Sequence, residues 1–261
     1  MSVLLSTIAP HSAFIHPRGH IIYMHAAVHV AVVVHVHGAA RALVVKLARP
    51  VLRIIGSALA AVFAPRRLIS VITPTWQRFA LLTRRCIPSV RAQDYGGPVD
   101  HIIVSDGPDE LLSRLGGVRF LPEHVAALNR GIHARRYGVD LARGDLVAYI
   151  DDDNAWRPNH LELLVEALER SGADFAYSRA LCTEPGGFRW TIGSDPPVHT
   201  QIDTSLIVHR RELLGVANWQ PTSGPADWDL IERWMRAGAT WVHVPVVTLD
   251  YYAREIPVAS R

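Results

Sequence analysis

Residues 68–172 alternate between short apolar runs rich in strand-forming residues and longer amphipathic segments. The apolar runs lie at 68–72, 99–104, 118–121 and 146–150. Segments with the spacing of a helix lie at 76–93, 129–142 and 158–170. This alternation predicts an α/β fold, in which helices cover both faces of a doubly wound, mainly parallel sheet with some mixed pairing.

Three of the four apolar runs end in polar residues that favour turns. These tips are Thr73-Pro74-Thr75, Ser105-Asp106-Gly107 and Asp151-Asp152-Asp153. Ligands of doubly wound sheets bind in the crevice beyond the carboxyl ends of the strands. We therefore expect the three tips to converge on one crevice.

The acidic triplet at 151–153 is the most distinctive of these tips. Adjacent carboxylates repel one another and are not buried without a counter-charge. Oxygen ligands favour Mg²⁺ or Mn²⁺, and an ion held by one or two carboxylates commonly binds phosphate oxygens at its remaining positions. The triplet predicts a cation site that faces a phosphate, and a solvated acidic turn is the alternative.

The pattern changes after residue 173. Strands are predicted at 175–178, 204–208 and 241–249, with a hairpin turn at 185–187 and an amphipathic helix at 226–237. We expect these elements to pack at one end of the same sheet rather than form an independent domain, and the tail at 253–261 to be loose.

Residues 1–67 differ in composition from the rest of the chain. They contain seven Arg or Lys, seven of the 14 histidines and no acidic residue, whereas the remainder carries 20 basic and 24 acidic side chains. The histidine-containing apolar run at 21–40 makes a poor membrane-spanning helix, while 42–64 is basic and amphipathic. We predict an extension that is disordered or lies on an anionic membrane surface, with metal binding by its histidines as a further alternative.

The composition also narrows the class of protein. The net acidic charge of the folded part disfavours nucleic-acid binding. The two cysteines, Cys86 and Cys182, are far apart in the sequence, so neither a disulfide framework nor a zinc site is indicated. We expect a cytoplasmic location, with the basic extension as a means of peripheral contact with the inner membrane.

Five segments, in their order along the chain, resemble motifs of the inverting GT-A glycosyltransferases of family 2. They are 69–78, 104–108, 133–145, 151–153 and 226–229. The third is similar to the family's Ala-Arg-Asn-x-Gly helix, the fourth to its Asp-x-Asp signature and the fifth to its late Glu-Asp motif. The resemblance covers about residues 68–250. It implies a GT-A domain at 68–252, with a nucleotide-binding half at 68–172 and an acceptor half at 173–252.

The resemblance implies a nucleotide-sugar donor, with UDP, GDP or dTDP as the carrier, and a divalent cation, Mn²⁺ or Mg²⁺. Asp151 and Asp153 would hold the cation against the leaving diphosphate. Asp106 would accept a hydrogen bond from the nucleotide base, and the guanidinium of Arg135 would bind phosphate oxygens. The other residues implied in donor binding are Pro74, Thr75, Arg78 and Asp152.

For the acceptor, which is a glycan, a lipid or a small molecule, the resemblance implies a general base. Asp227 would take the proton from the attacking hydroxyl, and the neighbouring Asp229 is the alternative. A single displacement assisted by this base inverts the configuration at the anomeric carbon. Three tryptophans, Trp190, Trp219 and Trp228, are either sugar-stacking platforms or core residues.

The sequence departs from the family pattern at three positions. Arg136 stands where the family's helix motif usually has asparagine. Ala226 stands where a glutamate commonly precedes the general base, and Asn154 stands where a second aspartate often follows the Asp-x-Asp signature. These changes affect the phosphate contacts, the setting of the base and the metal ligands, but none removes a group that the mechanism requires.

Simpler roles remain open for individual residues. Asp106 could simply be the aspartate of an Asp-Gly turn, and Arg135 could lie on a solvated helix face. Asp227 could serve only to cap the helix that follows it.

Other functions also remain open for the chain. A sugar-1-phosphate nucleotidyltransferase needs a glycine-rich phosphate loop after the first strand, and 73–76 contains no glycine. A haloacid-type phosphatase carries its Asp-x-Asp on the first strand, whereas here it follows a later one. The non-enzymatic alternative is a binding module docked to a membrane through the basic extension.

Overall fold

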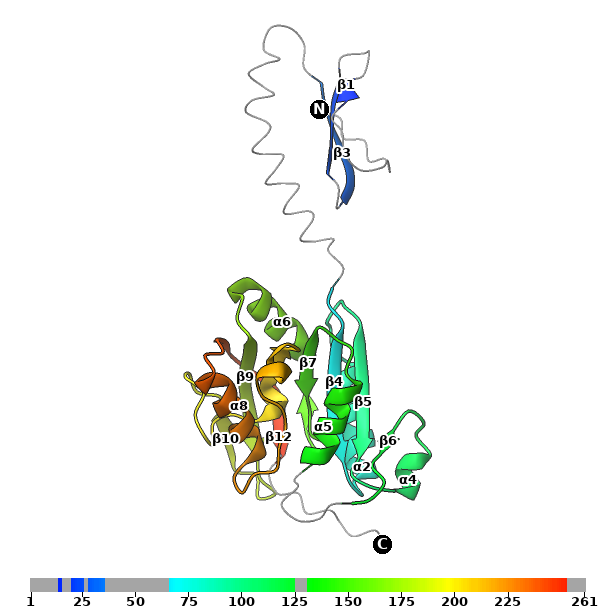
Figure 1. Cartoon of the computed structure of the whole chain (residues 1–261), viewed down its shortest axis with the longest axis vertical. Coiled ribbons are helices and arrows are strands. Elements are labelled where there is room, and N and C mark those ends of the chain that lie inside the picture. The colour runs from blue at the N-terminus through cyan, green and yellow to red at the C-terminus, as the bar shows by residue number, and fades with distance from the viewer. Residues whose placement is uncertain (1–13, 16–19, 26–27, 36–65, 125–130, 253–261) are drawn as a thin grey trace. The chain divides into compact units, whose positions relative to one another are not determined.

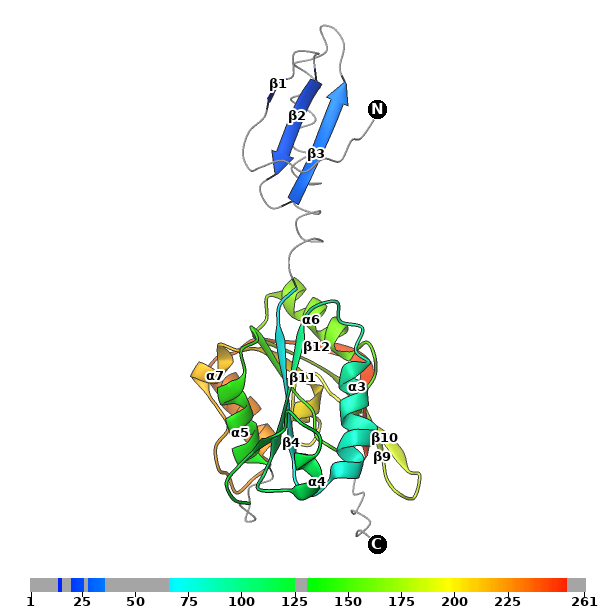
Figure 2. The same ribbon diagram turned by 90° about the vertical axis from the view of Figure 1, so that its right-hand side faces the viewer.

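The chain divides into two compact units, Met1–Pro65 and Arg66–Arg261. The computed structural model describes residues 14–15, 20–25, 28–35, 66–124 and 131–252. In the first unit the described backbone forms a three-stranded antiparallel sheet (Figures 1 and 2). Its strands are β1 (Phe14–Ile15), β2 (His20–His25) and β3 (Val28–His35).

Two predictions fall on residues that the structure does not describe. The amphipathic segment at 42–64 and the tail at 253–261 lie outside the described ranges, so membrane contact and a loose tail stay predictions. Among the described residues, no helix is both long enough and apolar enough to cross a membrane.

The second unit is built on a nine-stranded mixed sheet in the order β6-β5-β4-β7-β11-β9-β12-β8, with β10 paired to β9. The first four strands in this order run parallel. They are β4 (Ile69–Thr75), β5 (Val99–Ser105), β6 (Arg119–Phe120) and β7 (Leu146–Tyr149). The remaining strands are β8 (Ala155–Trp156), β9 (Phe175–Thr183), β10 (Arg189–Ile192), β11 (Ile207–Arg210) and β12 (Trp241–Tyr252).

Strand β11 marks the change from the parallel half of the sheet to the mixed half. It lies antiparallel between β7 and β9, and β12 then pairs in parallel with β9. Because β11 is antiparallel to β7, the residues that precede β11 lie next to the end of β7 at which the acidic triplet begins.

Helices cover both faces of the sheet, as Figure 2 shows for α3 and α5. One continuous helical segment contains α2 (Phe79–Leu81), a π-helical turn η1 (Leu82–Cys86) and α3 (Ile87–Arg91). The other helices are α4 (Glu110–Ser113), α5 (Ile132–Leu141), α6 (His160–Ser171), the 3₁₀ turn η2 (Thr204–Leu206), α7 (Leu213–Val216) and α8 (Ala226–Arg236). The predicted fold class, a mixed α/β sheet with helices on both faces, is confirmed.

The core lies around β4 and β7, in which every residue is buried. Because both faces of these strands are buried, their sequences are continuous apolar runs and do not alternate between apolar and polar residues. Helix α5 packs closely on β4 because Gly138 has no side chain: a Cβ there would lie 2.5 Å from Cγ2 of Ile72. The same packing fixes the position of Arg135, one turn earlier on α5.

Several predicted boundaries were wrong. The strand predicted at 204–208 begins only at Ile207, because Asp203 caps the 3₁₀ turn η2 by accepting a hydrogen bond from the N–H of Ser205, 2.7 Å away. The strand predicted at 175–178 continues to Thr183, where it pairs with β10 across the predicted hairpin. The short elements β8, α4 and α7 were not predicted, since two to four residues carry no periodic signal.

Candidate active site

A cavity of about 490 Å³ lies beyond the carboxyl ends of β4, β5 and β7. The three polar tips meet there, as predicted. The lining residues are Pro74, Thr75, Trp76, Arg78, Asp106, His124, Gly131, Arg135, Asp151, Asp152, Asp153 and Tyr251. Every residue implied in donor or cation binding by the sequence is among them.

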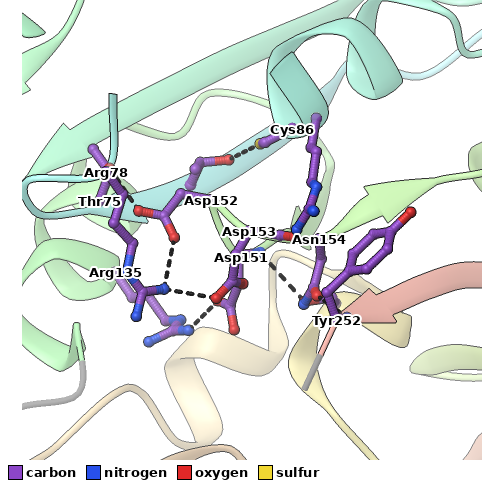
Figure 3. Close-up of polar contacts among 12 residues, drawn as sticks. Thr75, Arg78, Cys86, Arg135, Asp151, Asp152, Asp153, Asn154 and Tyr252 are labelled. Atoms are coloured by element: carbon purple, nitrogen blue, oxygen red, sulfur yellow. Dashed lines mark hydrogen bonds and ion pairs between the residues drawn. The ribbon is translucent and has the colours of Figure 1, made fainter. Parts of the chain in front are cut away.

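Arginines and a threonine surround the three carboxylates of the acidic triplet (Figure 3). The buried carboxylate of Asp152 accepts hydrogen bonds from the Thr75 hydroxyl at 2.7 Å and from Arg78 at 3.2 Å. Arg78 also donates to Asp153 at 2.7 Å. These contacts hold the tip in one geometry, with Asp152 pointing inward.

Burial makes the negative charges of Asp152 and Asp153 costly despite these partners. Burial raises the pKa of Asp152 to about 7, although Arg78 and Thr75 favour its charged form. Burial and the neighbouring Asp151 also raise the pKa of Asp153. A bound cation would relieve both carboxylates.

The donor atoms fit a cation that shares its coordination with a ligand. Within the described part of the chain, no group of three or more His, Cys, Asp or Glu is placed to hold a metal ion. Asp151 and Asp153, however, both open onto the cavity, and two carboxylates are what Mg²⁺ or Mn²⁺ commonly takes from a protein when phosphates supply the rest. The predicted pair therefore fits a cation completed by a phosphate ligand.

The far end of the cavity combines a carboxylate with an aromatic surface. Asp106 is buried, and its Oδ2 lies 3.2 Å from Nδ1 of His124. The imidazole of His124 stacks on Trp76 with 4.3 Å between ring centroids and 3° between ring planes. Gly107 has a φ of +120°, and a Cβ there would lie 2.8 Å from the backbone nitrogen of His124. Asp106 thus belongs to an Asp-Gly turn and also lines the cavity.

Arg135 lies at the centre of the site rather than on a solvated helix face. It is 7% exposed, donates to Asp151, and its guanidinium carbon lies 5.1 Å from the ring of Trp219. Burial disfavours its charge, but the nearby carboxylates, above all Asp151, outweigh burial and raise its pKa. Arg136, at the position that departs from the family pattern, is exposed and donates to the carbonyl of Trp219 at 3.0 Å.

A second cavity of about 180 Å³ shares Arg135 and Asp151 with the first. Its other lining residues are Asp203, Thr204, Trp219, Ala226 and Asp227. The two cavities therefore meet at one carboxylate and one guanidinium.

Asp227 lies in the first turn of α8 and lines the second cavity. Its Oδ1 accepts a hydrogen bond from the N–H of Trp228 at 3.0 Å, and burial raises its pKa even though Arg135 acts in the opposite direction. Asp229 instead binds Arg233 at 2.7 Å and is absent from the lining of both cavities. Of the two candidate bases, Asp227 therefore has the position that suits the role, and Asp229 does not.

The predicted tryptophans occupy different settings. Trp219 is buried at 1% exposure and also forms a wall of the second cavity. Trp190 stacks on Phe188 at 5.6 Å, and Trp228 lies 6.0 Å from His199, both outside the linings of the two cavities.

Sequence reasoning missed several residues that line the two cavities, among them Asp203, Trp76 and His124. Asp203 shares the second cavity with Asp227, and Trp76 and His124 form the stacked pair beside Asp106. Trp76 directly follows the predicted tip Thr73-Pro74-Thr75, so its position in the sequence could have indicated that it lines the cavity. For Asp203 and His124 the sequence offers no pattern, because their places depend on contacts between distant segments.

Comparison with known proteins agrees with this architecture. Residues 70–222 match the family model for glycosyl transferase family 2. The glucosyl-dolichyl phosphate glucuronosyltransferase of Haloferax volcanii is 30% identical over 141 residues, which cover 49% of this chain and 44% of that protein. The chain thus spans less than half the length of this relative.

Two solved structures share the GT-A fold. S. aureus TarS 1-349 in complex with UDP-GlcNAc has a TM-score of 0.58 at 16% identity, over 72% of this chain and 59% of TarS 1-349. The mannosyltransferase PcManGT from Pyrobaculum calidifontis, in complex with GDP-Man and Mn²⁺, has a TM-score of 0.54 at 17% identity, over 72% of this chain and 57% of PcManGT. Because the family model covers more than half of the sequence, the chain belongs to glycosyl transferase family 2.

Proposed function

We propose that this protein transfers a sugar from a nucleoside diphosphate sugar to an acceptor hydroxyl, with inversion at the anomeric carbon. The observation that carries the proposal is the pair of adjoining cavities. The larger is lined by the acidic triplet and the smaller by Asp227, and they share Arg135 and Asp151. Donor and acceptor bound in these cavities would meet where the cavities join.

The larger cavity suits a nucleoside diphosphate sugar. Asp106 would accept a hydrogen bond from the base, beside the backbone of Pro74 and Thr75. At the other end, Arg135 would donate to phosphate oxygens, for which a planar guanidinium is well matched. Arg78 and Asp152 would keep the acidic tip in place through the contacts that they make with each other. The complexes of TarS with UDP-GlcNAc and of PcManGT with GDP-Man support this class of donor.

Asp151 and Asp153 would hold a divalent cation, Mn²⁺ or Mg²⁺. When bound, the cation would supply Lewis-acid neutralisation of the leaving diphosphate. The raised pKa values of Asp152 and Asp153 support this, because burial disfavours their negative charges and a bound cation would offset that cost.

Asp227 would act as the general base. Its Oδ1 accepts a hydrogen bond from the N–H of Trp228, and the carboxylate keeps lone pairs that would accept the proton of the acceptor hydroxyl. The hydroxyl oxygen would form the new bond to the anomeric carbon as the bond to the diphosphate breaks. A raised pKa improves a carboxylate as a base.

The family assignment favours this function over the nucleotidyltransferase and over the membrane-docked binding module. The test is release of nucleoside diphosphate from UDP-, GDP- and dTDP-sugars by the full chain, with Mn²⁺ and with EDTA. We expect at least one donor to be consumed with Mn²⁺ and its turnover to fall by at least about tenfold in EDTA. An Asp153→Asn variant should behave in Mn²⁺ like the native chain in EDTA. Consumption of no donor would contradict the proposal.

A further inference from the structure

The second cavity contains a carboxylate that the reaction proposed above does not use. Asp203 lies in this cavity with Asp227, yet it is 24 residues away along the chain and belongs to the cap of η2 rather than to α8. The register of β11 against β7 brings it there. The N–H of Asp151 donates to the Ser205 hydroxyl at 3.3 Å and ties η2 to the acidic tip.

Asp203 and Asp227 are held in the same manner. Each uses Oδ1 to accept a hydrogen bond from a nearby backbone N–H, that of Ser205 at 2.7 Å and that of Trp228 at 3.0 Å. Asp203 also accepts a hydrogen bond from the Ser205 hydroxyl, so the described partners of each carboxylate lie within two residues of it. Both residues are partly exposed, whereas Thr204 and Ala226 beside them are buried. Two oriented carboxylates from different elements thus line the same cavity, and each has lone pairs left to accept a hydrogen bond from a ligand.

The charge of this cavity limits what that ligand is. The carboxylates of Asp151, Asp203 and Asp227 line it together with one guanidinium, that of Arg135. With the donor bound, the two positive charges of a cation at Asp151 are offset by the two negative charges of the donor diphosphate, so the side chains leave the cavity with a net negative charge. Burial raises the pKa of Asp203 to about 7, and the negative charges of Asp151 and Asp227 add to this rise. Carboxylates accept hydrogen bonds from hydroxyls but repel phosphates and other anions.

We infer that the acceptor is an uncharged, polyhydroxylated molecule such as a sugar, and that Asp203 binds a second hydroxyl of it while Asp227 takes the proton of the reacting one. Asp203 is therefore a residue that determines acceptor specificity. It selects neutral sugar hydroxyls over phosphate acceptors. This inference rests on the proposed function and adds the acceptor class to it.

The test uses the full chain and the donor that it consumes. Methyl α-glucoside, methyl α-mannoside and methyl α-galactoside are offered as neutral acceptors, and farnesyl phosphate as the anionic one. Hydrolysis of the donor in the absence of acceptor is measured separately. We expect transfer to at least one methyl hexoside and not to farnesyl phosphate. An Asp203→Asn variant should raise the KM for that hexoside about tenfold, the effect of one lost charge-assisted hydrogen bond.

Asp109→Asn is the matched control. Asp109 caps α4 by accepting from the N–H of Leu112 at 3.0 Å but lies outside the lining of both cavities. Asparagine is as good an N-cap as aspartate, so both variants should fold and melt like the native chain. An unchanged hexoside KM in Asp203→Asn, transfer to farnesyl phosphate alone, or donor hydrolysis without transfer to any hexoside would overturn the inference. Failure to consume any donor would instead reject the proposed function, and the inference with it.

Discussion

At the scale of single residues, the two acidic side chains of the first turn of α8 have different surroundings. Asp229 is neutralised by Arg233 within its own helix, whereas Asp227 opens onto the second cavity and forms no ion pair with the described residues of α8. Of the two, Asp227 therefore has the position that a general base needs.

Asp227→Asn should therefore lower kcat for transfer about 1000-fold, since a positioned general base contributes roughly 10²- to 10⁴-fold. The KM for the donor should stay within about twofold, because Asp227 lines the acceptor cavity and not the donor cavity. Steady-state kinetics of the two variants give the comparison. Asp229→Asn is the control and should keep most of the activity. An equal fall in kcat in the two variants would contradict a specific role of the Asp227 carboxylate, because it would trace the loss to a disturbance of α8.

At the scale of elements, α5 carries Arg135 into the site by lying close against β4. Gly138 allows this approach, because any side chain at this position would meet Ile72. A helix displaced outward would move the guanidinium away from the junction of the two cavities.

Gly138→Ala should destabilise the fold by about 1–3 kcal/mol, the usual cost of overpacking a filled core, and should also lower transfer activity. Urea unfolding and kinetics on the same preparation measure both. Gly215→Ala, in α7, is the control, since a Cβ at Gly215 meets no atom within 4 Å. If Gly138→Ala is as stable and as active as Gly215→Ala, the packing of α5 does not position Arg135.

The contact between α6 and β12 should make stability depend on pH. The buried His160, at the start of α6, lies with Nδ1 2.6 Å from the hydroxyl of Thr248 and stacks on Trp156 at 4.3 Å. Burial lowers the pKa of His160 to about 3. Because an unfolded histidine has a pKa of about 6.5, the unfolded chain binds the proton first. The stabilisation is complete above about pH 6.5 and is lost as the pH falls toward 3.

His160→Asn removes this titration while its amide can still reach Thr248. Between pH 6 and pH 4, the unfolding free energy of the variant should fall less steeply than that of the native chain, by up to about 1.4 kcal/mol per pH unit. Urea unfolding at several pH values measures both slopes, and the other titrating groups are common to the two proteins. Parallel slopes would contradict a neutral, buried His160.

At the scale of the whole molecule, the sequence predicts most of the parallel half and much less of the rest. β4, β5 and β7 are recognisable because central strands covered on both faces need unbroken apolar runs. Their polar tips are recognisable because parallel strands end at one edge. Six of the 12 residues lining the larger cavity belong to these tips, whereas Arg135 and Arg78 were implied only by the family resemblance.

The second cavity depends on pairing that no local pattern records. β11 inserts antiparallel between β7 and β9, and only this insertion places Asp203 beside Asp151. The contact between His124 and Asp106, which lie 18 residues apart in the sequence, is likewise not predictable from any local pattern. Contacts of this kind join distant segments, so they become visible only once the sheet order is known.

The most direct test of the account is the stereochemistry of the product. If Asp227 activates the acceptor across the junction from the donor phosphate, one displacement occurs and no covalent sugar–enzyme intermediate forms. Proton NMR of the anomeric signal, recorded as the full chain transfers the sugar from an α-linked nucleotide sugar, should show a β-linked product from the first time point. An α-linked product would contradict the account.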